Sequence, residues 1–379
     1  MDFTLSDDQR AIQDMARSFA QSEMAPHSAR WDEEKYFPVE VMREAAALGF
    51  AGIYVQEDVG GSGLKRLDAA IIFEELSRGD VATAAFISIH NMASWMIDRF
   101  GSDELRRRYL PRLTTMELIA SYCLTEPGSG SDAAALKTTA VRDGDHYVLN
   151  GSKTFITNGQ HAGMVILAAK TDPTGGAKGV SLFLVDMNLP GCARGRNLEK
   201  MGLHAQDTSE LFFDNVKLPL DSLLGDEGRG FAIMMNELPR ERLNLSAGAI
   251  AASEGLLAAT VAYTQERKAF GKPICQLQNT RFVLATCHTD IAINKAYVDQ
   301  CVRLYMQGKL DATQAAVAKM ASTDMQCRVA DACLQLFGGY GYMMEYPAAR
   351  AYVDARIQRI YGGTNEIMKE VIARSLVGR

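Results

Sequence analysis

The pattern of hydrophobic and polar positions divides the 379-residue chain into three parts. In residues 1–120 and 231–379, apolar residues recur at the three- and four-residue spacing of amphipathic helices. In residues 121–230 the apolar runs are short and end at turns such as Asp-Gly, Asn-Gly and Leu-Pro-Gly, which is typical of strands. We therefore predict an α+β chain that is mainly helical. It has an N-terminal helical domain, a middle antiparallel β domain and a C-terminal four-helix-bundle domain.

Single residues refine this division. Ser6 is a natural N-cap, and His90 lies in an apolar helix without an evident partner, so we interpret it as a hydrogen-bonded core histidine. The helices expected from the periodicity include Leu67–Arg78, Ala82–Phe100, Ala247–Arg267, Gln278–Gln307, Ala312–Leu336 and Tyr346–Gln358. The expected strands are Tyr147–Leu149, Met164–Ala169, Val180–Val185 and Ser209–Phe213.

Composition excludes several classes of function. A net charge of -6 and a pI near 5.6 argue against a nucleic-acid partner, because phosphate binding requires a basic face. The seven cysteines form no Cys-x-x-Cys pair and no metal-ligand spacing, so we expect reduced thiols and no metal site. No run of about 18 apolar residues appears, and Met1–Asp8 lacks the features of a signal or transit peptide. We expect no membrane span and a cytoplasmic location.

Two motifs in the middle part carry candidate chemistry. In Tyr122–Asp132, Gly128 and Gly130 let backbone N–H groups approach a bulky anion, and serines add hydroxyl donors. The second motif is Phe155–Gly159, a strand followed by a turn. The first motif resembles the flavin-binding signature of the acyl-CoA dehydrogenase family at nearly every position, and this resemblance covers the chain from Leu5 to Arg374.

The resemblance implies FAD as the cofactor and assigns residues to it. In family members an aromatic residue and a threonine of the second motif contact the flavin, while Arg267 and Phe270 reach the cofactor of a neighbouring subunit. The glycines of Gln335–Gly341 allow close approach of a phosphate or adenine. The implied FAD-binding residues are Tyr122, Leu124, Thr125, Gly130, Ser131, Phe155, Ile156, Thr157, Arg267, Phe270, Leu277, Gln278, Gln335, Leu336, Phe337, Gly338, Gly339, Thr364, Asn365 and Glu366.

The position of the family's usual catalytic base is occupied here by Gly362. A glycine accepts no proton, so either the chain is inactive or its base lies elsewhere. Glu241 stands where the long-chain and isovaleryl members carry a displaced base, and Pro239 is expected to kink the helix just before it. Glu237, one turn earlier on the same face, is the weaker candidate. The implied substrate-binding residues are Ser131, Leu238, Arg242, Gly362 and Gly363.

The resemblance also implies a reaction. The base removes the α-proton of an acyl-CoA, the β-hydride leaves to the flavin, and electrons pass to an electron-transfer flavoprotein. The N-terminal half resembles isobutyryl-CoA dehydrogenase and the C-terminal half the long-chain enzyme, so we expect a medium- or long-chain, straight or methyl-branched acyl group. The family further implies a homotetramer.

Two alternatives remain open from the sequence. One is an oxygen-using acyl-CoA oxidase-like flavoenzyme, although the extra C-terminal domain of the larger oxidases is missing. The other is a catalytically silent scaffold of the same fold. The intact cofactor motifs oppose silence, and the acidic pI opposes a DNA-associated scaffold.

Overall fold

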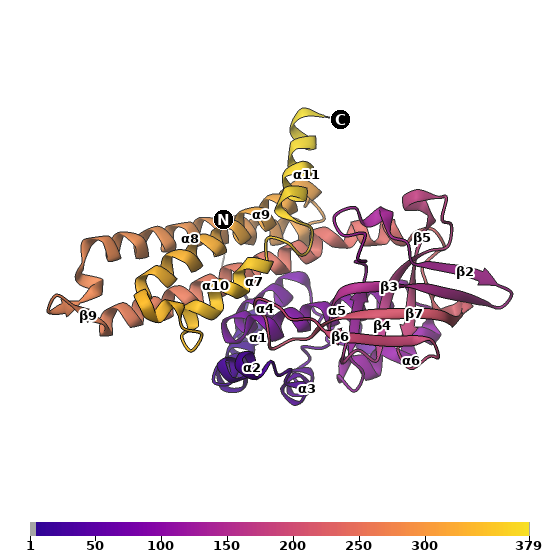
Figure 1. Cartoon of the computed structure of the whole chain (residues 1–379), viewed down its shortest axis with the longest axis horizontal. Helices are drawn as coiled ribbons and strands as arrows, with labels where there is room; N and C mark the ends of the chain where they lie inside the picture. The colour runs from indigo at the N-terminus through magenta and orange to yellow at the C-terminus, as the bar shows by residue number, and fades with distance from the viewer. Residues whose placement is uncertain (1–4, 379) are drawn as a thin grey trace.

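The structure, a computed structural model, describes residues 5–378. Met1–Thr4 and Arg379 lie outside the described residues. They include half of Met1–Asp8, in which no targeting signal is expected, and the outermost ends of the two predicted helical domains. In Figure 1 a sheet occupies one end of the molecule, a long helical bundle extends to the other, and the N-terminal helices pack between them.

The N-terminal part is helical, as the hydrophobic spacing predicts. Ser6 forms a capping box with Gln9, in which each side chain accepts a hydrogen bond from the other's backbone N–H. The helices are α1 (Asp7–Phe19), which continues as a π-turn (Ala20–Met24), α2 (Ser28–Glu34), α3 (Val39–Ala47), α4 (Arg66–Gly79), α5 (Val81–Phe100) and α6 (Asp103–Thr114).

His90 of α5 is a core histidine, as predicted. It is fully buried, its Nε2 lies 2.9 Å from Leu113 O, and its Nδ1 accepts the Ala120 N–H at 3.1 Å. Burial lowers its pKa to about 4, so the ring is neutral at pH 7. His90 therefore holds α5 against the first strand as a neutral ring.

The middle part is a sheet with the strand order β6-β7-β3-β2-β4-β5-β8, and β1 pairs with β4. Most pairs are antiparallel, as predicted, but β1 runs parallel to β4, and β2 meets β4 in a parallel pair at Thr139 and Lys170. The sheet is therefore mixed. The strands are β1 (Ala120–Cys123), β2 (Thr139–Asp143), β3 (His146–Thr157), β4 (Met164–Lys170), β5 (Val180–Asp186), β6 (Cys192–Asn197), β7 (Thr208–Pro219) and β8 (Leu223–Leu224).

The C-terminal part is a bundle in which α7, α8 and α9 pack on one another. The helix predicted from Ala247 begins earlier, at Gly230, and runs unbroken through Pro239. This part consists of α7 (Gly230–Glu266), the short hairpin β9 (Lys268–Ala269) and β10 (Lys272–Pro273), α8 (Gln278–Met306), α9 (Ala312–Phe337), α10 (Pro347–Ile357) and α11 (Asn365–Val377).

Among the described residues, α7 alone is long and apolar enough to cross a membrane by length and composition. Half of its most apolar window is buried inside the structure. A helix at the centre of a bundle has these properties without a membrane, because neighbouring helices cover its apolar faces.

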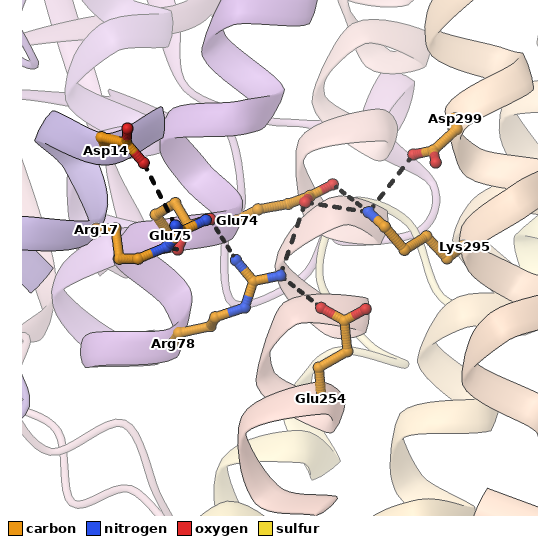
Figure 2. Close-up of polar contacts among 8 residues, drawn as sticks. All are labelled: Asp14, Arg17, Glu74, Glu75, Arg78, Glu254, Lys295 and Asp299. Carbon is orange, nitrogen blue, oxygen red and sulfur yellow. Dashed lines mark hydrogen bonds and ion pairs between the residues drawn. The ribbon is translucent and has the colours of Figure 1, made fainter. Parts of the chain in front are cut away.

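A network of ion pairs joins the N-terminal helices to the bundle (Figure 2). Glu75 of α4 is buried and pairs with Arg17 of α1 at 3.0 Å and with Arg78 at 2.7 Å. Arg78 also binds Glu254 of α7. On the other side, Glu74 pairs with Lys295 of α8 at 3.1 Å. Four helices thus meet through charges that all have partners; Asp14 and Asp299 complete the network.

Candidate active site

The two flavin motifs expected in the middle part lie side by side. The Thr154 N–H donates to Thr125 O at 2.9 Å, which joins the loop after β1 to the end of β3. The structure therefore brings the expected cofactor residues of Tyr122–Ser131 next to Phe155, Ile156 and Thr157.

A buried ion pair anchors this loop at its base. The fully buried Lys153 donates from Nζ to Glu126 Oε1 at 2.8 Å and to Leu124 O at 3.1 Å. The Glu126 carboxylate also accepts the backbone N–H groups of Lys137 and Thr138, at 2.6 and 3.0 Å. Burial by itself would raise the pKa of Glu126, but the hydrogen bond and charge of Lys153 hold it below its usual value. The carboxylate therefore stays ionised and fixes the loop.

The exposed part of this region is strained and open. Phe155 has φ +58° at an irregularity in the β3–β7 pairing, and its side chain is 67% exposed. A bulky residue with positive φ is unusual and is found at functional sites. A Cβ added at Gly128 or Gly130 would meet no atom within 4 Å, and Ser131 is exposed. An apolar ring thus faces solvent beside an open glycine loop.

One group of the cofactor residues expected in the bundle, Arg267, Phe270 and Gln335–Gly339, lies at the other end of the molecule. The hairpin that carries Arg267 and Phe270 is far from the sheet in Figure 1. Phe270 has φ +50° and is 91% exposed, and the Arg267 guanidinium lies 5.6 Å from the centre of the Tyr340 ring. The Tyr263 hydroxyl donates to Phe337 O at 3.2 Å, which brings the hairpin close to Gln335–Gly339.

Leu277 and Gln278 stand at the start of α8, at this same end; Leu277 is half-buried and Gln278 exposed. Within one chain, the expected cofactor residues at the hairpin end and those in the sheet are therefore not brought together.

The loop around Gly362 is held against α7 and α9. Arg242 Nε donates to Gly362 O at 3.4 Å. The fully buried Lys319 donates from Nζ to Gly363 O at 2.8 Å and to Asn365 Oδ1 at 2.9 Å. Thr364 caps α11 by accepting the Ile367 N–H at 3.3 Å, whereas Glu366 is exposed.

Gly362 has φ +67°, and a Cβ there would lie 2.5 Å from Leu245 Cδ1. The loop conformation thus favours glycine.

Glu241 lies close to this loop and is buried. It is one residue before Arg242 on α7, and its Oε2 accepts a 3.4 Å hydrogen bond from Ser88 of α5. Burial raises its pKa, which Arg66 and Arg240 oppose. Glu237 differs because it is paired with Arg240 at 2.7 Å. Of the two candidate bases, Glu241 is thus the buried one without an ion-pair partner in the described part of the chain; Leu238, on the turn between them, is half-buried.

Four residues around Glu241 were not among the candidates from the sequence: Tyr54, Arg66, Ser88 and Asn244. They come from segments far apart in the chain and meet only after folding. A single arginine in Leu-Lys-Arg-Leu-Asp gives no signal of burial, yet Arg66 is only 3% exposed.

Helix α5 connects the two halves of the site. Ser88 donates to Glu241, and two residues further along, His90 accepts the Ala120 N–H at the start of β1. The glycine loop and the buried carboxylate are therefore fixed to the same helix.

Comparison with known proteins shows the family of the chain. Three family models match in order: acyl-CoA dehydrogenase N-terminal domain at residues 6–117, middle domain at 121–216 and C-terminal domain at 228–377. The chain is 45% identical over 378 residues to a mitochondrial isobutyryl-CoA dehydrogenase of Dictyostelium discoideum, covering 98% of this chain and 90% of that protein. It is 43% identical to the mitochondrial long-chain specific acyl-CoA dehydrogenase of Sus scrofa, covering 97% and 86%.

Solved structures give the same result. A chain in a structure described as an electron transferring flavoprotein of Acidaminococcus fermentans matches with a TM-score of 0.96 and 38% identity, over 100% of both chains. A glutaryl-CoA dehydrogenase from Mycobacterium smegmatis, in complex with FADH2, matches with a TM-score of 0.94 and 31% identity, over 99% and 96%. The chain therefore belongs to the acyl-CoA dehydrogenase family of oxidoreductases.

Proposed function

We propose that this protein uses FAD to oxidise a fatty acyl-CoA, with a medium- or long-chain, straight or methyl-branched acyl group, to the trans-2-enoyl-CoA. Glu241 is the α-proton base and an electron-transfer flavoprotein is the acceptor. Membership of the family and the named dehydrogenase relatives support the reaction class. The observation that carries the assignment of the base is a buried, unpaired carboxylate beside a loop in which glycine replaces the usual glutamate.

The residues present fit FAD. The exposed ring of Phe155 and the open surface around Gly128 and Gly130 suit a flat heterocycle and its phosphates. Phe270, 91% exposed, and the nearby Arg267 suit an aromatic base and a pyrophosphate. When bound, FAD supplies the acceptor for the β-hydride.

The chain's own residues would handle the α-proton. One carboxylate oxygen of Glu241 takes it from the substrate, and burial raises the pKa of this carboxyl toward a value suited to removing a proton from carbon. The Gly362 N–H has no hydrogen-bond partner within residues 5–378. It is available to the thioester carbonyl, whose oxygen gains negative charge as the proton leaves. Arg242 fixes this loop by binding Gly362 O.

We also propose a homotetramer in which Arg267 and the Gln335–Gly339 segment complete the cofactor site of a neighbouring chain. Support comes from the distance of this end from the sheet and from the apolar residues exposed on α8, Phe282 (60%) and Ile293 (65%). Light scattering of the flavin-loaded protein tests this. A stable, flavin-loaded monomer contradicts it. The cytoplasmic location stays a prediction from sequence.

The decisive test follows flavin bleaching after mixing acyl-CoA with the purified protein under argon. Wild type should bleach, and Glu241→Gln should bind flavin normally but bleach about 10²–10⁴-fold more slowly, because only proton acceptance is lost. Glu237→Gln is the matched control and should keep most of the rate. Bleaching of Glu241→Gln at the wild-type rate overturns the base assignment, and a protein that takes up no FAD overturns the proposal as a whole.

A further inference from the structure

Arg66, the first residue of α4, is a buried arginine without a carboxylate partner. It is 3% exposed, and no carboxylate lies within ion-pair distance of its guanidinium in the described part of the chain. Its Nε and Nη2 atoms have no hydrogen-bond partner. Burial lowers the pKa of Arg66, but a guanidinium stays protonated in proteins. An unneutralised positive charge therefore lies inside the protein.

The neighbouring Arg240 is different. Its Nη1 donates to Glu237 at 2.7 Å, so its charge is balanced locally. Its guanidinium also stacks 3.6 Å above the Trp95 ring. Of the two arginines that act on Glu241, Arg66 is thus the one whose charge is not already used in an ion pair.

Hydrogen bonds connect Arg66 to Glu241 in three steps. Arg66 Nη1 donates to Asn244 Oδ1 at 2.6 Å. Asn244 Nδ2 donates to Ser88 Oγ at 3.3 Å, and Ser88 Oγ donates to Glu241 Oε2 at 3.4 Å. This series of hydrogen bonds starts at Arg66 on α4, passes through Asn244 on α7 and Ser88 on α5, and ends at the Glu241 carboxylate. Each donor points the same way, toward the negative end.

The other groups around Glu241 do not replace this charge. On its own helix, Glu237 opposes ionisation of Glu241, and Arg240 is paired with Glu237. On α5, Ser88 is neutral. Tyr54 contacts Arg66 through its hydroxyl and lies under the guanidinium, with its ring centre 4.3 Å away, and Tyr305 of α8 flanks Arg66 at 5.6 Å. Burial raises the pKa of Tyr54, so its hydroxyl stays protonated at neutral pH.

We propose that Arg66 is a positioning residue for catalysis: its charge and the Asn244–Ser88 hydrogen bonds keep the buried Glu241 ionised and oriented toward the substrate. This rests on the proposed role of Glu241. Without a nearby cation, a carboxyl this deeply buried would hold its proton at neutral pH and could not accept another. Arg66 thus determines the lowest pH at which the base works.

The sign of the effect separates this role from a purely structural one. Removing the charge of Arg66 raises the pKa of Glu241. The acid limb of the pH–rate profile, where the rate of flavin reduction falls as Glu241 becomes protonated, therefore moves to higher pH. Above the new limb the rate recovers or exceeds wild type, because a more basic carboxylate is a stronger proton acceptor. A residue that only supports packing would lower the rate equally at every pH.

The experiment measures the rate of flavin reduction by acyl-CoA from pH 5 to pH 10 in the loaded enzyme. Arg66→Met and Arg66→Gln should each move the midpoint of the acid limb up by at least about one pH unit, the size of effect expected from one close charge. Arg66→Lys keeps the charge and should stay near the wild-type midpoint. Asn244→Leu cuts the hydrogen bonds but keeps the charge, so it should lower the plateau more than it moves the midpoint.

A second readout does not depend on turnover. Infrared difference spectra against Glu241→Gln report the protonated carboxyl of Glu241 as pH is varied, and its titration should move upward in Arg66→Met. An unchanged midpoint in both neutral variants, or an equal shift in Arg66→Lys, overturns the role of Arg66. Wild-type reduction by Glu241→Gln would instead show that the base itself is misassigned, so the two failures are distinguishable.

Discussion

Two clusters of charged side chains that both include residues of α4 and α7 differ in how their charges are paired. In the network of Figure 2, each carboxylate lies within ion-pair distance of a cation, and the charges join four helices. Around Glu241, neither that carboxylate nor Arg66 has an ion-pair partner within residues 5–378. Buried charge without a partner is costly, and such costs concentrate at reactive sites. The paired charges of the network hold four helices together, whereas the unpaired charges of Glu241 and Arg66 are available for chemistry.

The largest expected effect separates activity from stability at Glu241. Glu241→Gln should lose about 10²–10⁴-fold in flavin reduction, yet unfold at a temperature equal to or above wild type at pH 7. The pKa of Glu241 is raised in the folded protein, mainly by burial, so ionisation of wild type destabilises the fold as pH rises above the ordinary glutamate value. Calorimetry at several pH values checks this. The variant's advantage should vanish below about pH 4.3, and a lower melting temperature at pH 7 would contradict the comparison.

Glu75 in the network should behave in the opposite way. Glu75→Gln leaves Arg17 and Arg78 without their shared carboxylate, and the expected loss is about 1–3 kcal/mol in the free energy of unfolding. Denaturant titration measures this loss. Flavin reduction per folded molecule should be unchanged, and a slower reduction at full flavin loading would show that the network is coupled to the site.

Moving the base across the site sharpens the comparison further. In the Glu241→Gln background, Gly362→Glu should restore little by itself, because φ is +67° and the new Cβ would lie 2.5 Å from Leu245 Cδ1. Adding Leu245→Ala removes that clash. The triple variant should recover about tenfold in rate, equivalent to about 1.4 kcal/mol of barrier. Stopped-flow reduction of the double and triple variants decides the matter; equal rates would show that Leu245 is not the obstacle.

The smallest effect is expected at the exposed edge of the network. The Asp14 side chain is 73% exposed and lies 3.4 Å from Arg17. Asp14→Asn should change the free energy of unfolding by less than about 0.5 kcal/mol. Denaturant titration beside Glu75→Gln provides the matched pair, and a loss as large as that of Glu75→Gln would show that exposure does not govern these charges.

The fold could be predicted from sequence where the signal is local. The N-cap at Ser6, the strands Met164–Lys170 and Val180–Asp186, and the three-part division follow from spacing within a few residues. The parallel pairing of β1 with β4 could not be predicted in this way, because the partners are more than forty residues apart. A helix kinked at Pro239 was predicted, but the continuity of α7 from Gly230 to Glu266 was not, because the apolar spacing indicated a helix only from Ala247.

The candidate site divides in the same manner. The glycine loop, the replacement at Gly362 and the choice of Glu241 over Glu237 came from motifs in the chain, and their roles stay predictions. The charge of Arg66 could not be predicted from a motif. Arg66 is 175 positions away from Glu241 and follows a lysine in a polar turn. Burial and long-range contact, which no local pattern encodes, decide that part of the site.

The continuity of α7 also restricts how the gene can change. One helix of about 55 Å carries Glu241 near its start and ends next to the Arg267 hairpin. Inserting or deleting one codon between them would turn the hairpin by about 100° relative to the carboxylate. Length variation between these positions should therefore be tolerated poorly, except in steps near seven residues that restore the rotation. Loops such as Asp172–Gly176 can vary in length without such a constraint.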